Sequence, residues 1–199
     1  MDFSLTDEQQ LIGETARRFG AEKLAPGYIA REKDGRIAAS MIREMGGLGL
    51  IGVDLPQAFG GLDADGVTAG LVIEGVAAAD LSVAYVQLLG SLMGSILVHH
   101  APKEVAKEVV PRICRGETVV ALGLTEPRGG SDAANLQLKA HRTNDGYVLD
   151  GEKTSISMIA QAESIVVFAR TGEASSGARG VTAFHVPLDR PGISRSSFN

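Results

Sequence analysis

The sequence predicts an α+β chain, in which an N-terminal all-α domain is followed by an antiparallel β domain of barrel or sandwich type. Three observations predict this order. Apolar residues recur at helical spacing up to about residue 117. β-rich runs follow from residue 118, and an Asn-Asp-Gly turn at residues 144–146 separates two of them. We place the domains at residues 1–117 and 118–199. We expect the second to be incomplete, because residues 191–199 match neither a capped helix nor a finished strand.

Local signals predict the helices of the first domain. A capping box at Thr6–Gln9 begins the first helix, and the Pro-Gly pair at residues 26–27 ends it. Pro102 suits the first position of the last helix, which runs to Ile113. The helices between them are expected at residues 38–48, 67–79 and 81–100.

Alternating and β-branched runs predict the strands of the second domain. Leu136, Leu138 and Ala140 alternate with polar neighbours, as in a half-buried strand. A polar hairpin loop is expected at residues 173–179. The expected strands cover residues 118–124, 136–140, 147–149, 165–169 and 181–186.

A run without charged residues, from Leu81 to Val98, reaches the lower limit for a membrane span. It contains polar residues, Gln87 among them, and Asp80 precedes it. No positively charged flank favours insertion into a membrane. We therefore expect a buried helix of a soluble bundle and no membrane span.

Composition excludes several classes of function. The chain has 199 residues with 44% hydrophobic and 22% charged residues, which is typical of a globular protein. Its net charge of −5 offers no general attraction to nucleic acid or to an anionic membrane. The single cysteine, Cys114, excludes an internal disulfide and a cysteine metal site. Residues 1–4 show no secretory signal, so we expect a cytoplasmic or mitochondrial-matrix-like compartment.

Three short patterns suggest chemistry that their context opposes. Gly47–Gly52 matches G-x-G-x-x-G, but a predicted helix precedes it and a proline-bearing loop follows, the reverse of a dinucleotide-binding turn. His99 and His100 are adjacent on a predicted helix, so their side chains diverge and no metal site is expected. Ser131-Asp132 lacks the G-x-S-x-G elbow of a hydrolase, and His141 and His185 fall within predicted strands.

The segment from Gly123 to Asp132 is the most informative part of the chain. It begins at a strand end and passes through Pro127 and two glycines, Gly129 and Gly130. Such a loop exposes backbone N–H groups and small hydroxyls, which can hold an anionic or carbonyl-bearing cofactor. A plain turn between strands fits the spacing equally well.

This segment resembles the acyl-CoA dehydrogenase signature, G-[hydrophobic]-T-E-x-x-x-G-S-D. Further matches to the same family extend along the whole chain. They lie at Phe3–Gln9, Leu55–Gly61, Glu74 with Ala77–Ser82, Pro111–Gly116, Gly151–Lys153, and Gly180–Pro187 with Pro191-Gly192.

The resemblance implies that these two domains hold FAD and an acyl-CoA against a C-terminal helical domain. Thr125 would hydrogen-bond the isoalloxazine ring, and Ser131 would contact both cofactor and acyl-CoA. It also implies α,β-dehydrogenation, electron transfer to an electron-transfer flavoprotein, and a homotetramer. The catalytic Glu is expected beyond Asn199, so no residue of this chain is assigned as the base. The residues expected to bind the cofactor are Leu122, Leu124, Thr125, Gly130, Ser131, Ser155 and Ser157.

This sequence departs from the family pattern after the Gly-x-Lys turn. The family's W-[IV]-[TS]-N is replaced by Ser155-Ile156-Ser157-Met158, which keeps one hydroxyl at Ser157 and loses the indole. Asn135 stands where the family has a small residue. Loss of a large aromatic wall beside the flavin leads us to the hypothesis that the acyl group is branched or alicyclic.

Two other functions remain open from the sequence. The chain could be a non-catalytic module that binds acyl-CoA, flavin or a partner and lacks the base. It could also belong to a flavin monooxygenase of the same fold, which would use O₂ as its electron acceptor.

Overall fold

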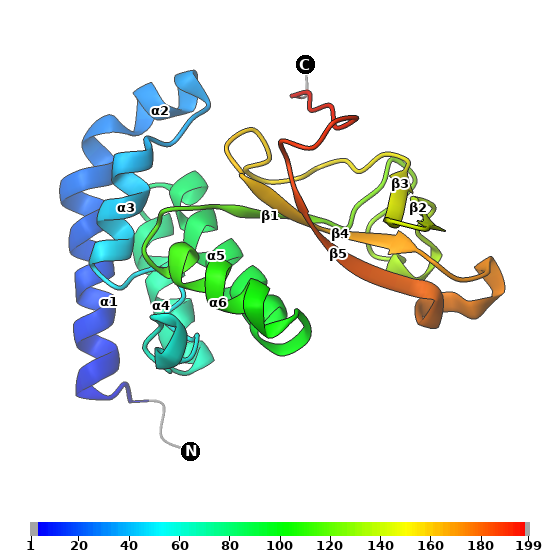
Figure 1. Ribbon diagram of the computed structural model, residues 1–199. Coiled ribbons are helices and arrows are strands. Elements are labelled where there is room, and N and C mark those ends of the chain that lie inside the picture. The colour runs from blue at the N-terminus through cyan, green and yellow to red at the C-terminus, as the bar shows by residue number, and fades with distance from the viewer. Residues whose placement is uncertain (1–3, 198–199) are drawn as a thin grey trace. The chain divides into compact units, whose positions relative to one another are not determined.

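The computed structural model describes residues 4–197, which form two compact units (Figure 1). The first is Met1–Val119 and the second is Val120–Asn199. Phe3, at the start of the expected family opening, lies outside the described residues, as do Phe198 and Asn199 at the C-terminal end.

The first unit is all-helical, as predicted. Its first helix begins with the expected capping box. The Thr6 hydroxyl accepts a hydrogen bond from Gln9 N (3.2 Å), and Gln9 Oε1 accepts one from Thr6 N (3.0 Å). The longer helices are α1 (Asp7–Phe19), α2 (Tyr28–Asp34), α3 (Ala39–Gly47), α4 (Gly66–Ala77), α5 (Leu81–His100) and α6 (Lys103–Cys114). The short turns are η1 (Gly20–Leu24), η2 (Ala25–Gly27) and η3 (Gln57–Phe59).

The helical path does not end at Pro26 and Gly27, and this prediction is wrong. A π-helical turn, η1, and a 3₁₀ turn, η2, carry the chain past Pro26 into α2. Pro26 has no backbone N–H to donate, but Ala25 N donates to Gly20 O and Tyr28 N donates to Ala25 O, so the turns continue on both sides of it. The Arg31 guanidinium donates to the carbonyl oxygen of Leu24. Arg31 also pairs with the buried Asp80 carboxylate at 2.8 Å, which fastens α2 to the start of α5.

Helix α5 has the bounds that the sequence predicts. Asp80 caps it by accepting a hydrogen bond from Val83 N at 3.1 Å. Among residues 4–197, α5 is the one helix long and apolar enough to cross a membrane, and a core helix passes the same test. Half of its most apolar window is buried, and α5 packs on α4 and α6. At the other end, Pro102 caps α6 instead of occupying its first turn, because its ψ of 140° is extended.

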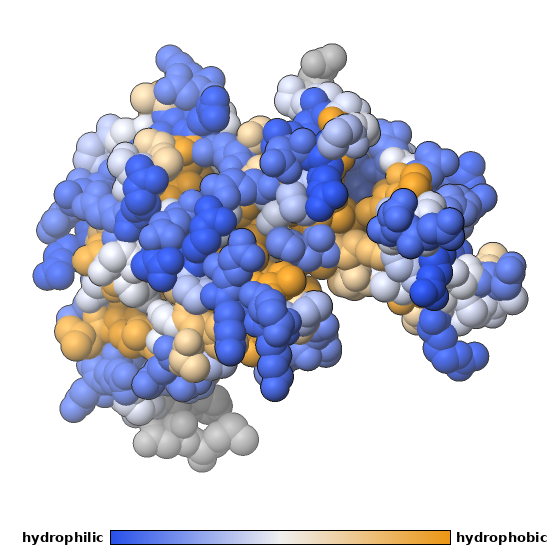
Figure 2. All heavy atoms as spheres, viewed as in Figure 1, coloured by the Kyte–Doolittle hydropathy of each residue, from blue (hydrophilic) through white to orange (hydrophobic). Residues whose placement is uncertain are grey.

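Buried polar groups hold the loop at residues 48–65 to α5. The Gln87 side chain is fully buried; its Oε1 accepts from Gly52 N at 2.6 Å and its Nε2 donates to Ser91 Oγ at 2.9 Å. Ser91 Oγ in turn donates to the Asp54 carboxylate. The loop turns tightly, since a Cβ on Gly61 would lie 2.0 Å from the carbonyl oxygen of Leu55. On the face of this unit shown in Figure 2, hydrophilic residues surround smaller apolar areas.

The described residues of the second unit form one five-stranded sheet. Its central strand β4 pairs along its whole length with β5, antiparallel. β1 pairs with the first half of β4, and β2 meets its last residue, both in parallel. β2 and β3 form an antiparallel hairpin at the predicted turn. The strands are β1 (Val120–Gly123), β2 (Lys139–Thr143), β3 (Gly146–Asp150), β4 (Ser164–Arg170) and β5 (Val181–Pro187), with 3₁₀ turns η4 (Ala133–Asn135) and η5 (Ala174–Gly180).

A helical domain followed by a β domain is confirmed, but the expected all-antiparallel barrel or sandwich is not observed. The described strands form a mixed sheet that is not closed into a barrel. The physical reason is the long connection from β1 to β4, which lets both strands run in the same direction. The alternation of apolar and polar residues predicts where a strand lies, but it does not predict which strand it pairs with or in which direction.

We predict that Gln87→Leu lowers the free energy of unfolding by about 2 kcal/mol, because the buried Gly52 N–H loses its acceptor. Urea unfolding measures this change. Gln10→Leu is the matched control, since the Gln10 side chain hydrogen-bonds Leu5 O at an exposed position. An equal effect of the two substitutions would contradict the role of the buried amide.

Candidate functional site

The loop after β1 carries most of the predicted site residues. Leu122 lies on β1 opposite Val166 of β4. Leu124, Thr125 and Gly130 are partly exposed, and Ser131 is exposed. The loop folds back on itself, since Glu126 N donates to Gly129 O (3.0 Å) and Gly129 N donates to Glu126 O (2.9 Å). A Cβ on Gly130 would lie 3.0 Å from Thr125 Oγ1, so the loop closes tightly on that hydroxyl.

A second segment, residues 151–158, lies against this loop. Thr154 N donates to Thr125 O at 2.9 Å, and the Lys153 ammonium donates to Leu124 O at 3.0 Å. Ser155 and Ser157, which follow, are exposed. The structure therefore brings together two stretches that the sequence pointed to separately.

A buried ion pair holds the two segments. Glu126 Oε1 lies 2.8 Å from Lys153 Nζ, and the two side chains are 7% and 5% exposed. The same carboxylate accepts from Gln137 N at 2.6 Å and from Leu138 N at 2.8 Å. All of these partners are structural, so Glu126 anchors the loop and is not placed as a base.

This anchor also explains where β2 begins. Leu136, Leu138 and Ala140 are buried and alternate with exposed neighbours, as predicted. The N–H groups of Gln137 and Leu138 nevertheless bond to the Glu126 carboxylate, so ladder pairing starts only at Lys139.

The environment of Glu126 lowers the pKa of its carboxyl group. Burial alone raises this pKa. The hydrogen bond from Lys153, the backbone N–H groups of Leu138 and Gln137, and the Lys153 charge together outweigh burial and lower it. Glu126 is therefore ionised at neutral pH.

Two positions of the second segment have left-handed backbone conformations. Ser155 has φ 53° and Met158 has φ 59°, which few non-glycine residues adopt. Both stand where this sequence departs from the family pattern. The family's Asn suits a left-handed position better than Met158, because Asn and Asp tolerate that region.

Beyond Ser131 the loop is closed by its own side chains. Asn135 Nδ2 donates to Asp132 Oδ2 at 2.6 Å, and Asn135 N donates to Asp132 O at 3.0 Å. Asn135 thus has a local role that the small residue of the family pattern could not perform through its side chain.

The donors of this region fit the chemistry of a flavin nucleotide. Thr125 is a partly exposed residue, and Ser131, Ser155 and Ser157 are exposed residues. Hydroxyls and loop N–H groups donate to the carbonyl and ring-nitrogen acceptors of an isoalloxazine and to phosphate oxygens. The buried side-chain polar atoms of the described residues all have hydrogen-bond partners.

The rejected patterns have the structural context that the sequence predicts. Helix α3 precedes Gly47–Gly52 and a turn-rich loop follows. His141 and His185 lie on β2 and β5. Within residues 4–197 there is no group of three or more His, Cys, Asp or Glu side chains that could hold a metal ion. Burial raises the pKa of the Cys114 thiol to about 11, so it is protonated at neutral pH.

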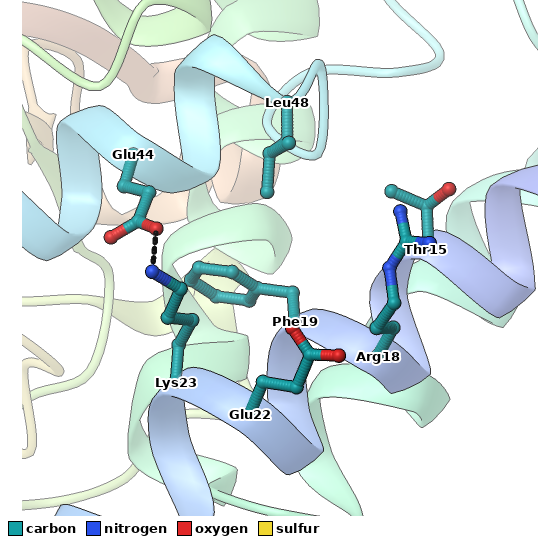
Figure 3. Close-up of a pocket in the computed structure, with 7 residues that line it drawn as sticks. All are labelled: Thr15, Arg18, Phe19, Glu22, Lys23, Glu44 and Leu48. Atoms are coloured by element: carbon teal, nitrogen blue, oxygen red, sulfur yellow. Dashed lines mark ion pairs between the residues drawn. The ribbon is translucent and has the colours of Figure 1, made fainter.

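A separate pocket of about 330 Å³ lies in the helical unit, between α1, η1 and α3 (Figure 3). Lys23 of η1 points towards Glu44 of α3, and their charged atoms are 2.9 Å apart. None of the predicted site residues lines this pocket. The lining residues are Thr15, Arg18, Phe19, Glu22, Lys23, Glu44 and Leu48.

Sequence reasoning missed the groups that position the loop. Lys153 stood out only as part of a Gly-x-Lys turn, and nothing in its spacing from Glu126 indicated an ion pair. Arg170, at the end of β4, carried no signal beyond its place after an apolar strand.

A helical unit followed by a β unit, with a hydroxyl-bearing loop after the first strand, is the arrangement that the comparisons with known proteins test. Residues 6–117 match the N-terminal domain of acyl-CoA dehydrogenases, and residues 121–198 match their middle domain. The chain therefore belongs to the acyl-CoA dehydrogenase family.

Individual relatives agree with this assignment. Benzylmalonyl-CoA dehydrogenase of Aromatoleum aromaticum is 34% identical over 97% of this chain and 50% of its own length. Butyryl-CoA dehydrogenase from Megasphaera elsdenii has a TM-score of 0.86 at 33% identity, over 96% of this chain and 51% of that one. PigA, solved as a complex with FAD, has a TM-score of 0.86 at 25% identity, over 96% of this chain and 51% of its own. The chain thus spans about half the length of the curated relatives it matches.

We predict that Glu126→Gln lowers the free energy of unfolding by about 3 kcal/mol, because it leaves the buried Lys153 charge without its partner. Urea unfolding measures the loss. Glu117→Gln is the matched control, since Glu117 pairs with Arg115 at the same 2.8 Å but at the surface, where the midpoint should barely change.

The same pair gives a pH dependence with a definite sign. The pKa of Glu126 is lowered in the folded state, so its stabilisation is complete above the ordinary carboxyl pKa and is lost as pH falls through the lowered value. The difference between wild type and Glu126→Gln should therefore shrink below about pH 4. If the difference in free energy of unfolding between wild type and Glu126→Gln stays constant down to pH 3, the ionised Glu126 is not the source of the stabilisation.

Proposed function

We propose that this chain forms the FAD-binding and acyl-CoA-binding part of an enzyme that dehydrogenates an acyl-CoA thioester between Cα and Cβ. The observation that carries this proposal is the hydrogen bond from Thr154 N to Thr125 O. It joins the two stretches to which the family pattern assigns flavin contacts. Membership of the family supports the same function.

In this proposal the residues of the loop bind and orient. Thr125 and Ser157 donate hydrogen bonds to the flavin ring, and Leu122 and Leu124 pack beside it. Gly130 lets the backbone approach closely, and a hydroxyl at Ser131 contacts cofactor and acyl-CoA. Ser155 lies next to the ring, where the family has an indole. Donors at the ring's polar edge would stabilise the negative charge of the reduced cofactor.

The chain spans about half the length of the curated relatives it matches, so the proposal places further parts of the site outside it. We propose that a carboxylate base from a C-terminal helical domain takes the α-proton. Bound FAD would accept the hydride that leaves Cβ, and an electron-transfer flavoprotein would then remove the two electrons. The full-length protein is proposed to assemble as a homotetramer.

The acyl group is proposed to be bulkier than a straight chain. Replacement of the family's Trp by Ser155 removes a large side chain beside the flavin, and Ser155 is exposed. A relative at 34% identity acts on benzylmalonyl-CoA, which carries an aromatic ring. Both observations favour a widened pocket.

The test is the visible spectrum of the purified protein in its native assembly, before and after anaerobic addition of acyl-CoA. We expect a yellow protein that bleaches. A yellow protein that no acyl-CoA bleaches would contradict dehydrogenation, and a colourless one would favour the binding module without catalysis. Oxygen consumption that matches turnover would instead favour the monooxygenase.

For the acyl group, we predict a higher kcat/KM for branched, alicyclic or aryl acyl-CoA than for butyryl-CoA, by about tenfold. Ser155→Trp should reverse this preference, while Ser155→Ala should keep it. Steady-state kinetics with a panel of thioesters measures both. A preference for straight chains in the wild type would contradict the widened pocket.

A further inference from the structure

The guanidinium of Arg170 joins two loops that are far apart in the sequence. Its Nε donates to Leu136 O at 3.1 Å, and one terminal nitrogen donates to Ala134 O. The other terminal nitrogen donates to Glu173 O at 3.4 Å and Gly177 O at 3.3 Å. Four backbone carbonyls, two in each loop, thus share one planar cation.

The first of these loops continues directly from the candidate site. Ala134 lies in η4, three positions after Ser131, and Asn135 in the same turn closes on Asp132. Glu126 fixes the next stretch through the N–H groups of Gln137 and Leu138. The end of this loop, residues 134–138, is therefore held from two sides. Its backbone N–H groups donate to Glu126, and its carbonyl oxygens accept from Arg170.

The second loop is the connection from β4 to β5, which contains η5. Arg170 is the last residue of β4, and its own N–H donates to Leu138 O at 2.7 Å. This is also the point where β2 joins β4, through the pair Lys139 and Arg170. Figure 1 shows the end of β4 beside the β2–β3 hairpin.

Arginine suits this position for a geometric reason. Its guanidinium offers five N–H donors in a fixed plane, so one side chain can hold several carbonyls in a set arrangement. Lysine offers a point charge with three donors and no fixed plane. The local fit is close, because a Cβ on Gly180 would lie 3.1 Å from a terminal nitrogen of Arg170.

We propose that Arg170 is a positioning residue, which fixes the segment from Ser131 to Leu136 for ligand binding and couples it to the β4–β5 connection. This inference rests on the proposed function, because it takes Ser131 as a contact to FAD and acyl-CoA. Arg170 itself touches neither ligand in this assignment. Its effect passes through the carbonyls of Ala134 and Leu136.

The test compares Arg170→Met and Arg170→Lys with wild type in the full-length holoenzyme. With FAD at saturation, Arg170→Met should raise the KM for acyl-CoA about tenfold while kcat stays within about twofold. Arg170→Lys should show a smaller rise. Arg142→Met is the matched control, since Arg142 is exposed on β2, and its KM should equal that of wild type.

Hydrogen exchange on the flavin-free protein gives a second readout. The amides of residues 131–136 should exchange faster in Arg170→Met than in wild type, while those of the helical unit stay unchanged. A folded Arg170→Met with wild-type KM and wild-type exchange overturns the proposal, even if it unfolds at lower temperature. If Arg170→Met does not fold, Arg170→Lys decides, and a wild-type KM and exchange in that variant overturn the proposal.

These outcomes separate the two proposals. If acyl-CoA does not bleach the wild-type holoenzyme, the proposed function fails. The exchange rates at residues 131–136 then still show whether Arg170 positions the loop.

Discussion

The second unit depends on one buried charge, the Glu126 carboxylate. Removing an ionised carboxylate from water costs several kcal/mol, so it must be compensated inside the protein. Here the Lys153 ammonium and two backbone N–H groups compensate it. Each partner comes from a different stretch of chain from Glu126 itself. Neutralising the charge therefore fixes the loop after β1, the approach to β2 and the turn at Lys153 in one arrangement.

That arrangement determines what the loop can offer to a ligand. Its inward polar groups are satisfied by Glu126 and Arg170, while Ser131, Ser155 and Ser157 are exposed residues. Donors that are held in place before a ligand arrives lose little conformational freedom on binding. In the helical unit, too, buried polar side chains hold distant segments in place. Buried Gln87 accepts from Gly52 N, and buried Asp80 holds Arg31, so each buried polar group fixes a loop or a helix end.

Two of the departures from the family pattern fall where the backbone has a left-handed conformation. Ser155 and Met158 both have positive φ, and both replace residues of the family motif. Left-handed conformations persist at non-glycine positions only when the surrounding structure enforces them, and they gather at ligand sites. Ser155 is small and exposed at that constrained backbone, and the proposal of a bulkier acyl group rests on this position.

The sequence alone determined what depends on neighbours along the chain. The capping box at Thr6, the bounds of α5 and the turn at residues 144–146 follow from local spacing, and the motif at residues 123–132 identified the family. The tertiary structure decided the continuation of the helix past Pro26, the parallel pairing of β1 with β4, and the start of β2 at Lys139. It also decided the partners of Glu126 and Arg170. Each of these involves a group distant in sequence, such as Asp80 on Arg31 or Glu126 on the Leu138 amide, so no local pattern could reveal it.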